Sequence, residues 1–211
     1  MLYIFGCGGG AIQMLQDNRM FIKDEEITFR AQEIIFVEDE PVSDTVKFGS
    51  HTYSLIPYSA FMYTPSDFGH ITAFNIEYKH KMSKAELNWI NSYSKSYTRF
   101  DDIRIGKGVR INWNVYIDGR ARIGSFVKLN AFAFIGHDCS VGDYSYISQH
   151  VVLDKGVTIG KNCMIFENST LLPDVSVGDN TVIGAGSVVT KDIPSNVVAY
   201  GSPCKVVRDN D

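Results

Sequence analysis

The sequence predicts a small α/β domain over residues 1–95, a solenoid of short parallel β-strands over residues 96–194, and a C-terminal cap over residues 195–211. Two regularities predict the solenoid. An aliphatic side chain occupies every sixth position from Ile105 to Val189, and a glycine recurs every eighteenth position from Gly106 to Gly178. A β-prone run followed by a glycine-rich turn predicts the α/β domain.

The six-residue repeat supplies the core of the predicted solenoid. A helix needs apolar spacing near 3.6 and a two-sided sheet needs alternation, so an unbroken period of six indicates stacked short strands. Three hexads make one coil, and five coils stacked at about 4.8 Å would stand about 24 Å tall. The aliphatic positions are Ile105, Ile111, Ile117, Ile123, Leu129, Ile135, Val141, Ile147, Leu153, Ile159, Ile165, Leu171, Val177, Ile183 and Val189. Small or β-branched residues four positions later are expected to line the corners: Val109, Val115, Ala121, Val127, Ala133, Cys139, Ser145, Val151, Val157, Cys163, Ser169, Val175, Thr181, Ser187 and Ile193.

The N-terminal region begins with a predicted strand over residues 2–5 and a glycine-rich turn. Ile12, Met14, Leu15 and Met20 then predict a helix. A strand, a glycine-rich turn and a helix together let bare backbone amides approach a phosphate, here those of Gly6, Gly8, Gly9 and Gly10. A tight turn without a ligand is the alternative interpretation.

A second strand is predicted over residues 33–37, and it ends at Glu38 and Asp39. A Rossmann-type unit places an acidic group near a ribose hydroxyl at this distance along the chain. The alternative is a solvated acidic turn that Pro41 stops. Further on, we expect a strand over residues 70–76 and a helix over residues 84–93 with Ser83 as its N-cap. Residues after 194 leave the repeat and are expected to cap the last coil.

Composition indicates an ordinary soluble chain. The net charge of -4 and the pI of about 5.7 give no indication of nucleic-acid or anionic-membrane binding. The N-terminus lacks the pattern of a signal peptide and the apolar runs are short, so we expect a cytoplasmic protein without membrane insertion. Cys7, Cys139, Cys163 and Cys204 form no CxxC motif, and we expect them to be reduced and structural, with no metal bound.

The repeat resembles a known family. The hexads, the segment over residues 183–194 and the Gly-Ser-Pro-Cys-Lys segment over residues 201–205 resemble the left-handed parallel β-helix acyltransferases with hexapeptide repeats. Within them, the chain is most similar to the sialic acid O-acetyltransferases and the bacillosamine-pathway N-acetyltransferases. Those enzymes place a small nucleotide-sugar-binding α/β domain before the β-helix. The resemblance implies a left-handed coil, a homotrimer and acetyl-CoA as co-substrate, whereas connection rules alone favour a right-handed coil.

His137 and Asp138 are the candidate catalytic residues. His137 stands at an outward-facing turn position of its hexad, where packing has no use for an imidazole, and Asp138 follows it directly. An amine or hydroxyl that attacks a thioester must lose a proton, and imidazole titrates near neutrality. A neighbouring carboxylate would fix the tautomer and favour the cation. In the resembling family the matching histidine is the general base. A surface histidine with no task is the alternative.

Other site residues follow from the resemblance. Asn130 matches an active-site position that contacts the sugar or orients the base, although asparagine is also common at turns that need positive φ. Some relatives carry a second histidine where this chain has Tyr146, which puts that contact to the acetyl group or substrate in doubt. The γ-class carbonic anhydrases bind zinc with three histidines, but His137 and His150 alone make a poor metal site.

The acetyl-CoA site is expected along the groove between neighbouring subunits. The resembling enzymes stabilise the oxyanion with a backbone amide one coil beyond the base, which corresponds to Lys155 or Gly156. The pantetheine arm is expected against the backbone of Gly184, Ala185 and Gly186. Lys191 and Lys205 are expected near the nucleotide of the cofactor, although both lysines could equally serve solubility.

The sequence therefore predicts an acetyl-CoA-dependent N-acetyltransferase that acts on a UDP- or dTDP-linked amino sugar. The alternative is O-acetylation of a sugar hydroxyl such as that of sialic acid. A non-catalytic β-helix scaffold or sugar-binding subunit is a third possibility. The acceptor sugar, its nucleotide and the length of the acyl chain stay open at this point.

Overall fold

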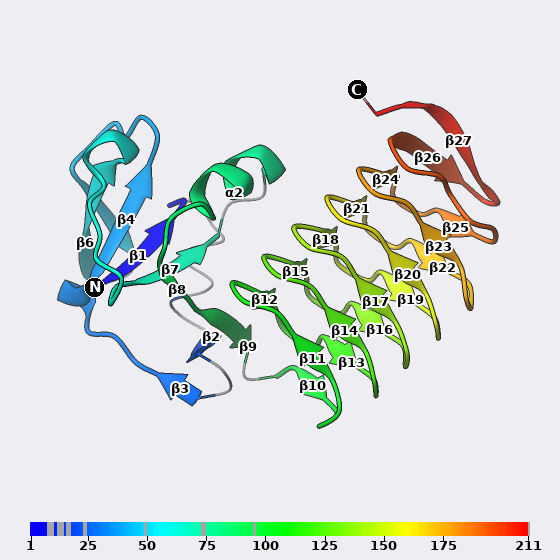
Figure 1. Cartoon of the computed structure of the whole chain (residues 1–211), viewed down its shortest axis with the longest axis horizontal. Coiled ribbons are helices and arrows are strands. Elements are labelled where there is room, and N and C mark those ends of the chain that lie inside the picture. Colours follow the sequence, from blue (N-terminus) through cyan, green and yellow to red (C-terminus); the bar gives the residue numbers. More distant parts are fainter. Residues whose placement is uncertain are drawn as a thin grey trace. The chain divides into compact units, whose positions relative to one another are not determined.

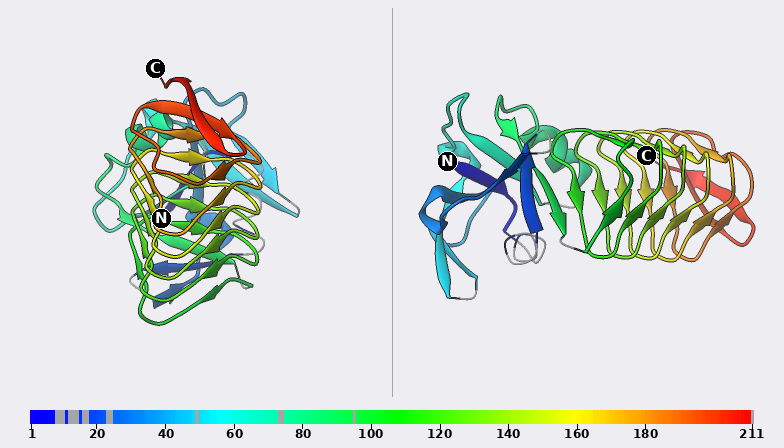
Figure 2. Two further views of the ribbon diagram at one scale, coloured as in Figure 1. Left: turned by 90° about the vertical axis from the view of Figure 1, so that its right-hand side faces the viewer. Right: turned by 90° about the horizontal axis from the view of Figure 1, so that it is seen from below.

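The computed structural model describes residues 1–7, 11, 15, 18–22, 25–48, 50–72, 75–94 and 96–210. The chain divides into two compact units, Met1–Tyr93 and Ser94–Asp211. Figures 1 and 2 show the stacked coils of the second unit, which run from β10 near the start of that unit to β25 near its end. No helix among the described residues is long and apolar enough to cross a membrane.

The first unit is built on one sheet whose central strands are parallel. Its strands lie in the order β5 (Thr45–Phe48), β6 (His51–Pro57), β4 (Ile34–Glu38), β1 (Leu2–Phe5), β7 (Phe68–Ile71) and β8 (Asn88–Trp89), with β5 antiparallel at the edge. The chain winds outward from β1 in one direction and then in the other, as in doubly wound folds. The carboxyl ends of β1, β4 and β7 therefore meet at one edge of the sheet.

The central strand of this sheet is covered on both faces. All four residues of β1 are buried, and Leu2 and Ile4 pack with Phe36 and Leu55 in the core. Continuous apolar burial is typical of parallel strands with cover on both sides. The other described elements are the hairpin β2 (Asn18–Ile22) and β3 (Glu25–Ile27), the 3-10 helices η1 (Ala31–Glu33) and η2 (Tyr58–Ala60), helix α2 (Ile76–Met82) and strand β9 (Asn91–Ser94).

Three element predictions in the first unit are wrong in whole or in part. The helix expected over residues 84–93 lies earlier, because the side chain of Asn75 accepts a hydrogen bond from the amide of Tyr78 and caps α2, whereas Ser83 closes that helix. Residues 88–89 and 91–94 form strands instead, and Ile76 belongs to the helix and not to the third strand. Met20 lies in β2 opposite Ile27, not in the first predicted helix. Ile12 and Met14 lie outside the described residues.

The second unit is the predicted solenoid, and it has three parallel sheets. The β10 sheet contains β10 (Thr98–Arg99), β13 (Tyr116–Ile117), β16 (Phe134–Ile135), β19 (Val152–Leu153), β22 (Thr170–Leu171) and β25 (Val188–Val189). The β11 sheet contains β11 (Arg104–Ile105), β14 (Arg122–Ile123), β17 (Ser140–Val141), β20 (Thr158–Ile159) and β23 (Ser176–Val177). The β12 sheet contains β12 (Arg110–Ile111), β15 (Lys128–Leu129), β18 (Tyr146–Ile147), β21 (Met164–Ile165), β24 (Val182–Ile183) and β26 (Val197–Gly201).

The repeat positions take the predicted places. Every aliphatic position from Ile111 to Val189 is buried, and Ile105 in the first full coil is half-buried. All fifteen of the small or β-branched corner residues are buried as well. The corners pass through left-handed backbone conformations, for example at Asn162 and Asn180 with φ of 57° and 54°. Asparagine tolerates that conformation better than most residues. The left hand of the coil stays a prediction.

Close packing between neighbouring coils requires the glycine at every eighteenth position. A Cβ atom on Gly142 would lie 2.6 Å from the backbone of Gly160 in the next coil. One on Gly124 would lie 2.5 Å from the carboxylate of Asp143. Neither glycine has a positive φ, so the contact between coils, and not the backbone conformation, excludes a side chain here.

The solenoid continues past the point where the repeat was expected to stop. Strand β26 still pairs in parallel with β24, with Ile183 opposite Ala199, but the step is 199 − 183 = 16 residues instead of 18. Ile193, predicted as a corner residue, bridges Val177 with the same shortened step, 193 − 177 = 16. Strand β27 (Cys204–Asp209) then turns back antiparallel on β26. The last coil is therefore two residues shorter than the others.

Candidate active site

His137 stands on a corner that two neighbouring coils hold in place. His137 follows β16 and lies in the corner between the β10 sheet and the β11 sheet, which is called here the His137 corner. The carbonyl oxygen of His137 accepts a hydrogen bond of 2.9 Å from the amide of Gly156, and the amide of Asp138 donates one of 3.0 Å to the carbonyl of Gly119. The His137 side chain is 46% exposed. A rigid backbone therefore presents the imidazole to solvent.

His137 and Asp138 form a hydrogen-bonded pair. The imidazole Nδ1 lies 2.8 Å from Asp138 Oδ2. Asp138 adopts φ of 62°, a left-handed conformation that aspartate tolerates and that turns its carboxylate back toward the ring. With Nδ1 as the donor to this carboxylate, Nε2 is the nitrogen that can accept a proton. The residues that the structure describes offer Nε2 no hydrogen-bond partner.

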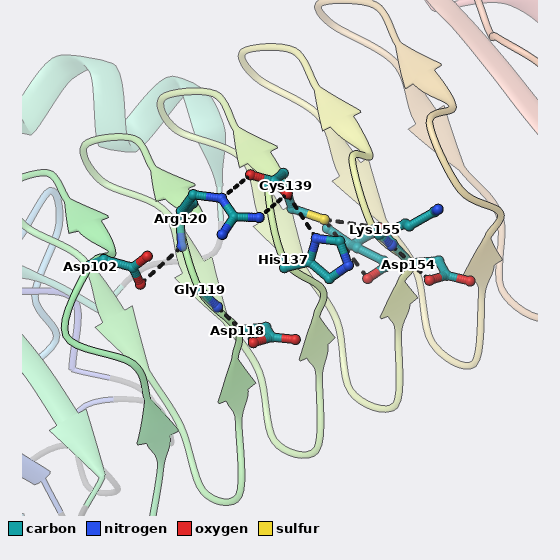
Figure 3. Close-up of polar contacts among 10 residues, drawn as sticks. Asp102, Asp118, Gly119, Arg120, His137, Cys139, Asp154 and Lys155 are labelled. Atoms are coloured by element: carbon teal, nitrogen blue, oxygen red, sulfur yellow. Dashed lines mark hydrogen bonds and ion pairs between the residues drawn. The ribbon is translucent and has the colours of Figure 1, made fainter.

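Arg120 makes a bidentate ion pair with the same aspartate. Its Nε lies 2.6 Å from Asp138 Oδ1 and its Nη2 lies 2.7 Å from Asp138 Oδ2. Figure 3 labels Arg120 and His137 and draws these bonds as dashed lines. Chiefly the bonds from Arg120, and then the bond from His137, hold the pKa of the Asp138 carboxyl well below its usual range. Sequence reasoning missed Arg120, although it stands eighteen residues before Asp138 and thus one coil away.

A surface groove opens beside the imidazole. It is lined by Phe100, Asp101, Asp102, Asp118, Gly119, Arg120 and His137. An adjoining charged hollow is lined by Asp102, Arg104, Arg120, Arg122 and Asp138. Asp102 and Arg120 line both hollows, and Asp102 Oδ1 accepts a hydrogen bond of 3.1 Å from the amide of Arg120. A ligand in the groove would meet the imidazole among several carboxylates.

The next coil carries the two amides predicted to bind an oxyanion. The Gly156 amide donates to the His137 carbonyl, as described above, so it is engaged within the backbone. The Lys155 amide donates 2.7 Å to the carboxylate of Asp154, a side chain that a ligand could displace. Of the two, the Lys155 amide is thus the better candidate. Burial raises the pKa of nearby Cys139 to about 11, so this thiol is not a nucleophile near neutral pH.

The residues predicted for acetyl-CoA lie at different places on the solenoid. Lys155 follows β19 and exposed Lys191 follows β25, so both stand on the His137 corner. Gly184, Ala185 and Gly186 lie instead where the β12 sheet turns toward the β10 sheet. The amides of Gly184 and Gly186 donate to the carbonyls of Ala199 and Glu167. Lys205 is exposed on β27. Within one chain, Lys155 and Lys191 therefore stand on a different corner from Gly184, Ala185 and Gly186.

Asn130 belongs to a separate polar cluster. It follows β15, at the corner between the β12 and β10 sheets called here the Asn130 corner, and so lies one strand away from His137. Its Nδ2 donates to Tyr146 Oη at 3.0 Å and to Gln149 Oε1 at 2.8 Å. Its Oδ1 accepts a hydrogen bond from Asn112. The predicted residues Asn130 and Tyr146 therefore meet each other and not the base of their own chain.

The same cluster contains residues that sequence reasoning missed. Ser148 donates to Glu167 at 2.7 Å, and its Oγ also lies 3.2 Å from Gln149 Oε1. Lys128 lies with its Nζ 5.3 Å from the centre of the Tyr146 ring. Burial, together with the charge of Arg110, lowers the pKa of Lys128 to about 8. These residues lie on or beside the outer positions of the β12 sheet, where the eighteen-residue period would have placed them together.

In the first unit, the predicted acidic residues lie at the carboxyl edge of the sheet. Glu38 Oε1 accepts a hydrogen bond of 2.6 Å from the amide of Cys7, directly after Gly6, whose φ is 98°. Asp39 pairs with Lys81 at 2.5 Å. Thr72 at the end of β7 donates to the carbonyl of Gly6 at 2.8 Å. Hydrogen bonds at this edge therefore connect the residues at the carboxyl ends of β1, β4 and β7. The predicted loop residues Gly8, Gly9 and Gly10 lie outside the described residues.

Comparison with known families identifies the repeat. Residues 156–191 match the family model described as bacterial transferase hexapeptide (six repeats). Residues 133–173 match the model described as hexapeptide repeat of succinyl-transferase. Residues 133–191 of the solenoid therefore match transferase-type hexapeptide repeats. Among curated protein sequences no significant match is found.

Solved structures match the chain along its whole length. PerB from Caulobacter crescentus, in complex with CoA and GDP-perosamine, is 21% identical with a TM-score of 0.80 and covers 98% of this chain and 96% of its own. WeeI from Acinetobacter baumannii is 19% identical with a TM-score of 0.80, covering 98% and 99%. The acetyltransferase domain of PglB from Neisseria gonorrhoeae is 18% identical with a TM-score of 0.81, covering 98% of each chain. The chain has the fold of these proteins, with an α/β unit before a β-helix, as the sequence predicts.

Metal ligands are not grouped in the described part of the chain. No three histidine, cysteine, aspartate or glutamate side chains among these residues are placed to hold one ion. The four cysteines are free thiols in the structure, and Cys139 and Cys163 are buried in the corner column.

Proposed function

We propose that this protein transfers an acetyl group from acetyl-CoA to the amine of a nucleotide-linked amino sugar. The observation that carries the proposal is the His137–Asp138 pair, held on a rigid corner beside an open groove. Support comes from the fold, because PerB, which shares it over nearly the whole chain, was solved with CoA and GDP-perosamine. Another structure with this fold, the PglB domain, was solved with acetyl coenzyme A.

The proposed reaction begins with removal of a proton from the amine. His137 Nε2 takes that proton as the amine nitrogen forms its bond to the thioester carbonyl carbon. Asp138 stabilises the resulting imidazolium through Nδ1. The carbon–sulfur bond then breaks, and the CoA thiolate leaves and takes the proton back from the imidazolium. The products are the N-acetylated sugar and free CoA, and His137 returns to its neutral state.

The co-substrate is proposed to follow the His137 corner away from the base. The Lys155 amide is placed to stabilise the oxyanion once a ligand displaces the Asp154 carboxylate. Exposed Lys191 on the same corner, with Lys205, is proposed to contact the phosphates of acetyl-CoA. The backbone of residues 184–186 is proposed to contact the pantetheine arm from a neighbouring subunit. No metal is needed for this reaction.

The nucleotide of the acceptor is proposed to bind the first unit. Ligands of doubly wound sheets bind outside the carboxyl ends of the strands, where the winding direction changes. Glu38 and Asp39 lie at that edge, next to the loop that begins with Gly6. The remaining loop residues Gly8, Gly9 and Gly10 are proposed to offer amides to the pyrophosphate.

A homotrimer is proposed as the active form. Asn130 and Tyr146 stand one corner away from His137 in their own chain, so they could reach a base only in a neighbouring copy. Exposed aromatic side chains on and beside the β10 sheet, those of Phe100, Phe132 and Phe134, offer apolar surface for such a contact. We further propose that the trimer works in the cytoplasm, where acetyl-CoA and nucleotide sugars are made.

The decisive test is an acetyl-CoA consumption assay with a panel of acceptors. The panel contains UDP-, dTDP- and GDP-linked 4-amino sugars together with free sialic acid. We expect turnover with an amino sugar and a large loss in the His137→Ala variant. Turnover with sialic acid alone would instead establish an O-acetyltransferase. Absence of turnover with every acceptor would contradict the proposed function. Equal turnover in His137→Ala and the native protein would contradict the assigned base.

A further inference from the structure

We propose that Arg120 is a positioning residue that aligns the Asp138 carboxylate with His137 and balances the charge of the pair. This proposal rests on the proposed function, since it assigns a role in the same proton transfer. Arg120 lies on the coil before His137, so neither sequence neighbourhood nor the family motif points to it. Its contact with Asp138 carries the inference.

The geometry makes Asp138 the centre of a three-residue unit. Arg120 occupies both carboxylate oxygens, at 2.6 Å and 2.7 Å, and fixes the plane of the carboxylate. The oxygen that accepts from Arg120 Nη2 is Oδ2, which is also the oxygen 2.8 Å from His137 Nδ1. Rotation of the carboxylate would break the contacts to both partners. The arginine therefore restricts the orientation on which the imidazole tautomer depends.

Arg120 occupies a backbone position that disfavours arginine. Its φ is 59°, in the left-handed region that glycine, asparagine and aspartate tolerate best. The other left-handed corner positions hold asparagine, aspartate, glycine or aromatic rings that stack one coil apart, as Phe126 does on Tyr144 and Phe132 on His150. Arg120 has a partner one coil on as well, but its partner is the aspartate that holds the imidazole. A purely structural pairing is the hypothesis against which the role must be tested.

Arg120 also changes the balance of charge around the imidazole. The charged groups around the His137 corner are Asp101 and Asp102 two coils back, Asp118 and Arg120 on the preceding coil, Asp138 beside the ring, Asp154 and Lys155 on the next coil, and Arg104 and Arg122 in the adjoining hollow. Figure 3 labels Asp102, Asp118, Arg120, Asp154 and Lys155 around His137. Every carboxylate in this set favours the imidazolium. Arg120 opposes them at close range, because it shares Asp138 Oδ2 with the ring. The guanidinium therefore offsets part of the negative charge that surrounds the imidazole.

The test compares Arg120→Asn with Arg122→Gln. Asparagine suits the left-handed backbone, so this variant is expected to fold while it removes the guanidinium. Arg122 lies in the same charged hollow, and the described residues show no ion pair between it and Asp138. Its replacement removes the same charge without touching the pair. We expect the acid limb of the kcat/KM profile of Arg120→Asn to move upward by about half a pH unit at low salt.

The direction follows from the charges. Loss of a cation beside the ring stabilises the imidazolium, so the base stays protonated up to a higher pH and activity is lost first on the acid side. Arg122→Gln is expected to leave the midpoint in place. Arg120→Lys retains the charge but not the bidentate contact, so its midpoint should stay near that of the native protein while kcat falls. Superimposable profiles for Arg120→Asn and the native protein, or equal shifts in both arginine variants, would overturn the proposal.

An NMR titration of the His137 ring provides a readout that needs no substrate. The midpoint in Arg120→Asn should move to higher pH, and the signal is assigned by its loss in His137→Ala. A structural role alone would change thermal stability without moving this midpoint. If no acceptor is turned over but the midpoint moves, the proposed function fails while the charge effect of Arg120 stands. If turnover depends on His137 but neither midpoint nor kcat responds to Arg120, only the present inference fails.

Discussion

The amide of Gly156 donates a hydrogen bond of 2.9 Å to the carbonyl of His137, so the next coil holds the backbone that carries the imidazole. Gly156 has φ of 69°, and a Cβ at this position would overlap the carboxylate of Asp174. The glycine thus combines a left-handed backbone with a close approach between coils. The geometry of the proposed base therefore depends on a residue with no side chain.

Replacement of Gly156 by alanine should destabilise the protein through both effects. We expect a loss of about 2 kcal/mol in the free energy of unfolding, measured by chemical denaturation, because the exposed Asp174 carboxylate can move away from a new Cβ at modest cost. Gly186 is a matched control, since its φ is also 69° and a Cβ there would meet nothing within 4 Å. Gly186→Ala should cost about 1 kcal/mol, the strain alone. Equal losses in the two variants would show that contact with Asp174 contributes nothing.

Replacement of His137 by alanine should abolish most of the activity and leave the fold intact. The side chain is nearly half exposed, so little packing is lost, and kcat should fall by about 10²–10⁴ as expected for a missing general base. Circular dichroism and the melting temperature should match those of the native protein. His51→Ala serves as the control, because His51 is exposed at the start of β6, far along that strand from the carboxyl edge. A kcat within twofold of native in His137→Ala would exclude the proposed base.

Replacement of Lys128 by methionine should stabilise the protein at neutral pH. The pKa of Lys128 is lowered to about 8 in the fold, below its unfolded value, so the unfolded chain binds more protons between about pH 8 and pH 10.4. The stability of the native protein should therefore rise with pH across this window. In Lys128→Met that rise should disappear, and the gain at pH 7 should be about 1–3 kcal/mol. Parallel stability curves for the two proteins between pH 7 and pH 10 would contradict the lowered pKa.

Replacement of Tyr146 by phenylalanine should weaken the polar cluster at the Asn130 corner. The lost hydroxyl accepts a hydrogen bond from Asn130 Nδ2 and lies 3.3 Å from the hydroxyl oxygen of Ser148. Because these partners are largely buried, we expect a loss of about 1–2 kcal/mol in thermal or chemical unfolding. Tyr116 holds the same repeat position on the β10 sheet and stacks on Phe134, so Tyr116→Phe should change stability by less than about 0.5 kcal/mol. A smaller loss in Tyr146→Phe than in this control would show that the cluster is satisfied without the hydroxyl.

The solenoid could be predicted in detail because aliphatic residues recur at every sixth position of the sequence. Each aliphatic residue from Ile111 to Val189 must enter the core, since one step of six residues returns the chain to the same orientation. The exception at Ile193 arose where the last coil loses two residues, a change that an extrapolated period cannot include. In the first unit the helix predicted over residues 84–93 was wrong. Asn75, which caps the real helix, and the pairing of β8 with β7 decided that segment.

The candidate site was predictable only in part. His137 and Asp138 stand out in sequence because an outward corner position has no packing need for them. Arg120 and Asp138 are distant in sequence, and only the stacking of coils brings them within 2.6 Å. The separation of Asn130 from His137 is likewise a property of the corners and not of their seven-residue spacing.

The sequence by itself determined the register of the β-helix, the buried columns and the identity of the imidazole–carboxylate pair, because a strict period leaves one way to bury the aliphatic side chains. Only the tertiary structure decided which residues surround that pair. The coils place residues eighteen positions apart in direct contact, and the corner geometry turns some side chains together and others away. The chemistry at His137 therefore depends on its own coil through Asp138 and on the coils before and after it through Arg120 and Gly156.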